Sequence, residues 1–183
     1  ANGTYAFDLT GTAGADDAAI TFTTALQLDS NSRISLSNND AGGDNANTIF
    51  GKLAGASTAT GAAGNVLIGE EAGNDLTIAD HNTVVGYQAF DLVTTLADGN
   101  TAIGWQSMHG SIVAENVDNC VAIGKQSLTG ALESEASGSV AVGYSALYAL
   151  TSGAGNVAVG YNAGSANVYG EYNTAVGYEA YFN

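Results

Sequence analysis

The sequence contains no proline, one cysteine and only three basic residues among its 183 positions. The single cysteine, Cys120, excludes a disulfide framework within the chain and a metal cluster built from cysteines. Arg33, Lys52 and Lys125 are too few and too scattered to neutralise a nucleic-acid backbone, and the net charge of −15 would repel one. That charge also opposes binding to an anionic bilayer, and no apolar run approaches the roughly 18 residues of a membrane helix. We therefore expect neither a nucleic-acid partner nor membrane insertion.

What the sequence does contain is a repeat. Eight five-residue segments each begin with Asn or a small residue, continue with a β-branched residue and two apolar residues, and end with Gly. They are Asn47–Gly51, Asn65–Gly69, Asn82–Gly86, Asn100–Gly104, Cys120–Gly124, Ser139–Gly143, Asn156–Gly160 and Asn173–Gly177. Their glycines recur every 17 to 20 residues, and Ala or Ser follows three positions after each. Self-similarity at a short, nearly constant period is typical of solenoids.

Each segment predicts a short buried strand. The second and fourth residues are β-branched or aromatic and share one face of the strand, because side chains alternate with period two. The third residue is also apolar, so both faces should be buried. We predict an all-β protein, a parallel β-solenoid (β-roll) of about eight coils, each with two short strands and two turns. In this prediction the alanines at the third position face outward, against a neighbouring chain (Ala102, Ala122, Ala141, Ala158 and Ala175).

Residues 1–46 lack the repeat, and the array occupies residues 47–183. Residues 4–9, 19–28 and 33–36 have the composition of short strands separated by turn residues. We expect this N-terminal β segment to cap the first coil or to connect it to another chain. The variable loops between the repeats should project from one side and turn their acidic residues toward solvent, among them Asp91, Asp98 and Asp118. The array runs to Asn183 without a polar cap, so we expect another domain or subunit to cover that end.

Stacked coils would align equivalent residues in files. Asn at the first position of six segments predicts a ladder of amides that bond to one another along the axis. Just after the glycines, Tyr87, Trp105, Tyr144, Tyr161 and Tyr178 form a candidate surface aromatic file, interrupted by Lys52, Glu70 and Lys125. Gln88, Gln106 and Gln126 form a shorter ladder beside it. Mutual stacking that stiffens the array explains the aromatic file most simply, and a carbohydrate-binding strip is the alternative.

No set of residues predicts catalysis, a cofactor or a metal site. His81 and His109 are single histidines in turns, and Cys120 lacks a neighbouring base that would activate it. The paired carboxylates (Asp16–Asp17, Glu70–Glu71 and Glu133–Glu135) are explained as solvated charge clusters, although a glycosidase pair could be drawn from them. Calcium could bind oxygens within Asn38–Asn45, but that spacing matches no known calcium loop. We expect a protein that is not an enzyme.

The repeat resembles the head repeats of trimeric autotransporter adhesins, whose Val-Ala-Ile-Gly cores build a parallel β-roll. It is even more similar to Asn-Thr-Ala-Ile/Val-Gly-Tyr-Gln-Ala arrays of bacteriophage tail fibres, as at Asn82–Ala89, Asn100–Ser107 and Asn173–Ala180. The resemblance covers about residues 28–183. It implies a homotrimer whose chains lie side by side and a location in a virion tail fibre or at a cell surface. The repeats here are longer than those of the adhesin heads.

Three functional hypotheses follow. The first is a structural segment of a homotrimeric viral tail fibre that supports attachment to a host surface glycan or receptor. The second is a bacterial extracellular adhesin or a secreted filament subunit that assembles head to tail. The third is a tailspike that degrades polysaccharide, because such enzymes are also built on β-solenoids and the fold alone does not decide function.

Overall fold

A computed structural model describes residues 47–58, 61–92, 96–110, 117–133 and 136–181, together with the backbone of residues 26–28 and 34–36. The chain divides into two units, Ala1–Ser37 and Asn38–Asn183. In the first unit, β1 (Leu26–Leu28) pairs antiparallel with β2 (Ile34–Leu36). These strands lie inside the predicted strands 19–28 and 33–36, whereas residues 4–9 lie outside the described residues. The cap or connector role of residues 1–46 stays a prediction.

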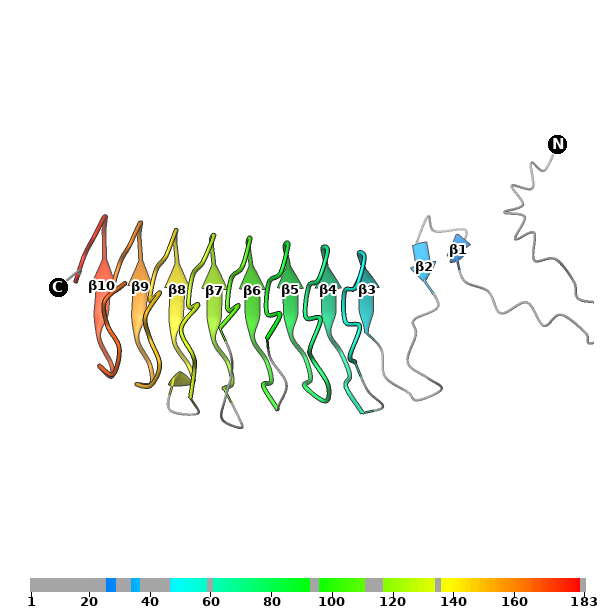
Figure 1. Ribbon diagram of the computed structural model, residues 1–183, viewed down its shortest axis with the longest axis horizontal. Helices are drawn as coiled ribbons and strands as arrows, with labels where there is room; N and C mark the ends of the chain where they lie inside the picture. Colours follow the sequence, from blue (N-terminus) through cyan, green and yellow to red (C-terminus); the bar gives the residue numbers. More distant parts are fainter. Residues whose placement is uncertain are drawn as a thin grey trace, which may run out of the picture. The chain divides into compact units, whose positions relative to one another are not determined.

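The second unit is a parallel β-solenoid. Its sheet contains eight three-residue strands in sequence order, which lie side by side in Figure 1: β3 (Thr48–Phe50), β4 (Val66–Ile68), β5 (Thr83–Val85), β6 (Thr101–Ile103), β7 (Val121–Ile123), β8 (Val140–Val142), β9 (Val157–Val159) and β10 (Thr174–Val176). Equivalent residues are direct partners, as Ala102 is to Ala122 and Ala122 to Ala141. The predicted all-β parallel β-solenoid is confirmed, and each of the eight repeat segments contains its predicted strand.

Among the residues that the structure describes, each coil contains one strand, not the two that we predicted. The glycine that ends the segment, which we call the corner glycine, begins a stretch with alternating positive φ angles: Gly143 has φ +136°, Ser145 +50° and Leu147 +49°. The corner glycine and the second and fourth residues after it have positive φ in all eight repeats. The backbone still bonds to both neighbouring coils, because Ser145 N donates to Lys125 O and Leu147 N donates to Ala163 O, both at 3.0 Å. The ladder of hydrogen bonds therefore continues around the corner without a second strand.

The third residue of each segment points into the coil, so our assignment of the outward face was wrong. Leu67, Val84 and all five alanines at this position are buried. The second and fourth residues, such as Val140 and Val142, face outward instead and are half-buried or exposed. The alanines are small because they share the interior with other side chains, not because another chain approaches them.

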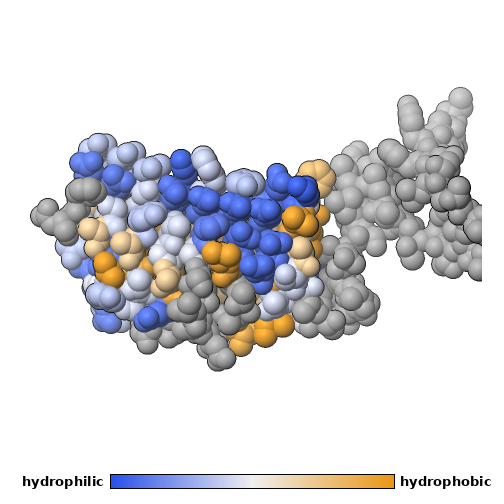
Figure 2. All heavy atoms as spheres, viewed as in Figure 1, coloured by the Kyte–Doolittle hydropathy of each residue, from blue (hydrophilic) through white to orange (hydrophobic). Residues whose placement is uncertain are grey.

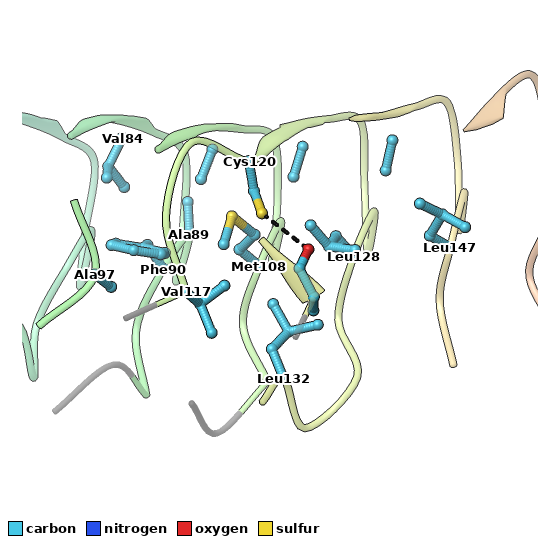
Figure 3. Packing of buried hydrophobic residues seen from close by; sticks show 14 of the residues in the cluster. Val84, Ala89, Phe90, Ala97, Met108, Val117, Cys120, Leu128, Leu132 and Leu147 are labelled. Carbon is cyan, nitrogen blue, oxygen red and sulfur yellow. Dashed lines mark hydrogen bonds between the residues drawn. The ribbon is translucent and has the colours of Figure 1, made fainter. Parts of the chain in front are cut away.

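The partner that fills this interior comes from the fourth position after the corner glycine. Where the strand contributes Ala122 or Ala141, Leu128 or Leu147 occupies that fourth position and is buried (Figure 3). Where the strand contributes Leu67, the fourth position is Gly73, and a Cβ there would lie 3.0 Å from Leu67 Cδ2. In these coils a large residue at one position is matched by a small residue at the other, so the two positions share one interior space. Two coils depart from this pattern, with Val84 and Phe90 both large and Ala158 and Gly164 both small.

Candidate functional site

The asparagines at the first position form the predicted ladder along the inside of the array. Asn65 N donates to Asn47 Oδ1 at 2.9 Å, Asn82 N donates to Asn65 Oδ1 at 2.9 Å, and Asn100 N donates to Asn82 Oδ1 at 2.8 Å. Their side-chain amides also donate to carbonyls in the interior, as Asn100 Nδ2 does to Val117 O at 2.8 Å. Near the C-terminal end, Asn173 N donates to Asn156 Oδ1 at 3.0 Å. The ladder satisfies buried backbone donors that a chain without asparagine would leave unpaired.

Cys120 takes one asparagine position and packs as a small buried side chain. Its backbone N donates to Asn100 Oδ1 at 2.8 Å, and its thiol donates to the carbonyl of Ala136 at 3.4 Å (Figure 3). Burial raises the pKa of the Cys120 thiol. A buried thiol with a raised pKa is a poor nucleophile, so this residue is structural.

A second ladder, which our sequence analysis missed, lies two residues before the first position. Asp80 N donates to Asp98 Oδ1 at 2.7 Å, Asp98 N donates to Asp118 Oδ1 at 2.8 Å, and Asp118 N donates to Ser137 Oγ at 3.0 Å. Each side chain accepts from the preceding coil, whereas each asparagine accepts from the following one. We expected Asp98 and Asp118 to point to solvent, and both are half-buried instead. The recurrence of Asp two residues before the segment was the available signal.

The corner glycines stack directly on one another. A Cβ on Gly143 would lie 2.2 Å from the carbonyl oxygen of Gly160, and the other corner glycines meet their successors almost as closely, except Gly177 at the end of the array. Neighbouring coils could not approach to hydrogen-bonding distance if these residues carried side chains. Glycine is therefore required by the contact as well as by its φ angle.

The predicted aromatic file exists on the surface, and Lys125 joins it rather than interrupts it. Tyr144 stacks on Tyr161 with ring centroids 4.9 Å apart, and Tyr161 stacks on Tyr178 at 5.2 Å. Lys125 Nζ lies 4.1 Å from the centroid of the Trp105 ring and 5.7 Å from that of Tyr144, which are cation–π distances. Nearer the N-terminal end of the array, Lys52 Nζ lies 3.1 Å from Glu70 Oε1 in an exposed ion pair.

The stacking limits what these rings can bind. Sugar rings pack on exposed aromatic faces, but stacking at interplanar angles of only 12° and 8° covers both faces of Tyr161 and one face each of Tyr144 and Tyr178. Tyr161 therefore presents its ring edge and hydroxyl to solvent, whereas Tyr178, at the end of the stack, is 72% exposed. A flat carbohydrate platform along the tyrosines is therefore a poor description, and mutual stacking explains their spacing.

The outer face of the sheet is apolar and uncharged. It consists of the second and fourth residues of the segments, which are all Thr, Val, Ile or Phe: Thr48, Phe50, Val66, Ile68, Thr83, Val85, Thr101, Ile103, Val121, Ile123, Val140, Val142, Val157, Val159, Thr174 and Val176. Phe50 and Val176, at its two ends, are each 67% exposed. With eight strands about 4.8 Å apart, this face is roughly 34 Å long. In the view of Figure 2, hydrophilic residues gather over the half of the array formed by β3–β7, and hydrophobic residues form separate patches.

Asp91 and His109 lie closer to one another than the sequence suggested. His109 Nε2 is 3.7 Å from Asp91 Oδ2, and Asp91 is only 8% exposed although we expected it in solvent. Asp91 Oδ1 is buried without a hydrogen-bond partner. Burial raises the pKa of the Asp91 carboxyl, with smaller contributions from Asp75 and Glu71, while His109 opposes them. His81, in contrast, is exposed in a turn.

The remaining candidates for chemistry do not converge. Glu70 forms an ion pair with Lys52, and Glu71 accepts a hydrogen bond from Gln88, so each carboxylate of this pair contacts a side chain of a neighbouring coil. Asp16–Asp17, Glu135 and the calcium candidates in Asn38–Asn45 lie outside the described residues. In the part of the chain that the structure describes, no group of three or more His, Cys, Asp or Glu is placed to hold a metal ion. No helix there is long and apolar enough to cross a membrane.

Comparison with known proteins adds no relative: no protein-family model, curated protein or solved structure matches the chain.

Proposed function

We propose that this chain is a non-enzymatic structural segment of an extracellular fibre, most simply a viral tail fibre, in which three copies associate side by side and support attachment to a host surface. The observation that carries the proposal is the outer face of the sheet. Sixteen outward positions over eight strands hold no charged residue, in a chain whose net charge is −15. Large uncharged and mostly apolar faces are typical of interaction surfaces, and contact with another copy of the chain is the simplest such interaction for a fibre segment.

The internal ladders support the mechanical part of this role. Backbone hydrogen bonds connect each coil to the next along one axis, and asparagine amides, aspartate carboxylates and stacked tyrosines add contacts between several neighbouring coils. Many polar side chains are used in these contacts, so the array holds its form without disulfides. A stiff element of this kind transmits force and sets a distance, which is what a fibre segment has to do.

The test is electron microscopy of purified full-length protein combined with light scattering in solution. Slender particles of three chains are expected. Helical filaments of a single chain would favour the second hypothesis, a secreted filament subunit assembled head to tail. Release of oligosaccharides from a host capsule, abolished by one carboxylate substitution, would establish a polysaccharide-degrading tailspike instead. A stable monomer would contradict the proposal.

A further inference from the structure

A groove of about 370 Å³ opens on the surface beside the tyrosine stack. Tyr144 and Tyr161 form one wall at the first position after their corner glycines. Tyr148, at the fifth position, forms the opposite wall with Ser165 from the next coil. The floor comes from the second position, which is the position of the glutamine ladder. The groove is open to solvent, and its volume lies near the lower end of the range of about 300–1,000 Å³ that small-molecule sites occupy.

The floor of the groove is the place where the glutamine ladder ends. Along the ladder each amide is used by the next: Gln88 Nε2 donates to Glu71 Oε2 at 2.8 Å, Gln106 Nε2 to Gln88 Oε1 at 3.0 Å, and Gln126 Nε2 to Gln106 Oε1 at 3.5 Å. The next residue in the column is Ser145, whose side chain is too short to continue the ladder.

The break leaves polar groups in the groove without partners. Gln126 Oε1, the Ser145 hydroxyl and the Asn162 side-chain amide make no hydrogen bond to any residue that the structure describes, and all three residues line the groove. In the earlier coils the equivalent amides satisfy one another. Hydrogen-bonding capacity is therefore concentrated at this one point of the column, where a ligand could use it.

The chemistry of the lining selects a class of ligand. It consists of three phenols, two aliphatic hydroxyls and two amides, and it contains no charged side chain. These groups both donate and accept, as the hydroxyls of a sugar do. A cation would find no carboxylate in the lining, and an anion would be opposed by the net charge of −15. Tyr148 stands in a different column from the stacked tyrosines, so its ring can offer apolar contact as well as a hydroxyl.

We propose that the groove between Tyr148 and the Tyr144–Tyr161 stack binds a neutral saccharide, which hydrogen-bonds to Gln126, Ser145 and Asn162 at the break in the ladder. This deepens the proposed role in attachment to a host surface by naming a ligand class and a site, and it rests on that role without requiring the association of three chains. It differs from a sugar platform on the tyrosine faces, since Tyr144 and Tyr161 are stacked on one another.

The test uses the full-length protein on an array of neutral and acidic oligosaccharides, followed by titration of the best neutral binder. Ser145→Gln continues the ladder through the groove. Glutamine already adopts the required φ at this position, +56° in Gln126 against +50° in Ser145, so the variant is expected to fold. Tyr148→Ala removes the opposite wall. Tyr87→Ala is the matched control, because Tyr87 and Tyr148 are each 45% exposed and Tyr87 lies outside the groove.

We expect the wild type and Tyr87→Ala to bind the same neutral oligosaccharide. Ser145→Gln and Tyr148→Ala should each weaken that binding at least about tenfold, the loss of one or two hydrogen bonds with their apolar contact. Absence of any neutral binder on the array, binding of acidic glycans alone, or equal affinity in Ser145→Gln would overturn the inference. Light scattering on the same samples reports assembly separately, so failure of the saccharide site is distinguished from failure of the proposed fibre role.

Discussion

At the scale of single residues, each corner glycine is required both for its positive φ angle and for the close approach of the neighbouring coil, and substitutions can separate these two effects. Gly143→Ala places a methyl group against the backbone of Gly160, whereas a Cβ on Gly138, which has φ +72°, would meet no atom within 4 Å. We expect Gly138→Ala to lower the free energy of unfolding by roughly 1–2 kcal/mol, the cost of a left-handed alanine. Gly143→Ala should cost at least about 2 kcal/mol more, because neighbouring coils must separate. Urea unfolding followed by circular dichroism measures both, and equal losses would contradict the close-approach argument.

Asp91 should make stability depend on pH. Its carboxyl is buried, so its pKa in the folded state lies above the ordinary value of 3.8. Between that value and the raised pKa the folded chain holds the proton more tightly than the unfolded chain, so stability falls as the pH rises through this window and stays lower above it. Asp91→Asn is therefore expected to be more stable than the wild type at pH 7, with the advantage disappearing below about pH 3.8.

The control for this prediction is Glu133→Gln, which removes one exposed carboxylate and the same charge. Thermal unfolding of the three proteins between pH 3 and 8 separates the local effect of Asp91 from general repulsion in an acidic chain. A difference between Asp91→Asn and the wild type that is constant over this range would show that burial of the carboxyl is not its cause.

Residues that recur in register were the ones the sequence could predict. The corner glycines and the asparagines occupy the same place in almost every repeat, and stacking turns such a pattern into contacts. Asp80, Asp98 and Asp118 also recur, but they lie at the ends of loops of different length, which hid their register. The proximity of Asp91 to His109 depends on two neighbouring coils at once, and no spacing along the chain reveals it.

At the scale of one coil, the interior shows how two positions in the chain can share one space. The strand residue and the fourth residue after the corner glycine are Leu67 with Gly73 in one coil and Ala122 with Leu128 in another. Ala122→Leu alone should destabilise by about 1–3 kcal/mol through overpacking. Leu128→Gly alone should cost about 2–5 kcal/mol through the cavity it leaves. The double variant reproduces the Leu67–Gly73 arrangement, so its loss should be smaller than the sum by at least about 1 kcal/mol.

A double-mutant cycle on urea unfolding measures this coupling. Additive losses would mean that the two side chains do not occupy a common space.

This sharing of space between a small and a large residue explains why we predicted the wrong orientation for the alanines of the strands. In the sequence, alanines between β-branched residues fit close contact with another chain as well as they fit contact with a large side chain of the same coil. Only the structure shows that Leu128 and Leu147, which have positive φ, lie against these alanines inside the coil.

The single strand per coil was hidden for a related reason. Glutamine, serine, methionine and leucine do not signal left-handed backbone, as glycine or asparagine would. Ser145 and Leu147 adopt it because the alternation lets their N–H groups bond to the coils on either side. The hydrogen bonds between coils therefore stabilise a positive φ angle in residue types that rarely adopt it otherwise.

At the scale of the whole molecule, the uncharged outer face predicts how assembly fails. Val142→Arg places a charge on this face, and we expect association to weaken at least about a hundredfold while the circular dichroism spectrum is retained, because a buried unpaired charge costs several kcal/mol. Ala131→Arg, on an exposed loop residue, adds the same charge elsewhere and should still assemble. Ala141→Arg points into the coil and should unfold the chain instead.

Light scattering and circular dichroism on these three variants distinguish the outcomes. Full assembly of Val142→Arg would mean that the outer sheet face is not the contact between chains. The sequence predicted that one strand face needs a partner but assigned the wrong face, the one with Ala102, Ala122, Ala141, Ala158 and Ala175, which the structure shows to be buried inside the coil.

The pairing of each coil with only its immediate neighbours has a genetic consequence. Nearly every repeat segment begins with the same kind of amide and ends in the same stacked glycine, so the backbone contacts of one coil fit those of any other. Duplication or loss of one in-frame stretch encoding 17 to 20 residues would change the length by one step of about 4.8 Å and preserve the remaining contacts. The number of coils therefore sets the length of the array, and evolution can change that length without changing the contacts between coils.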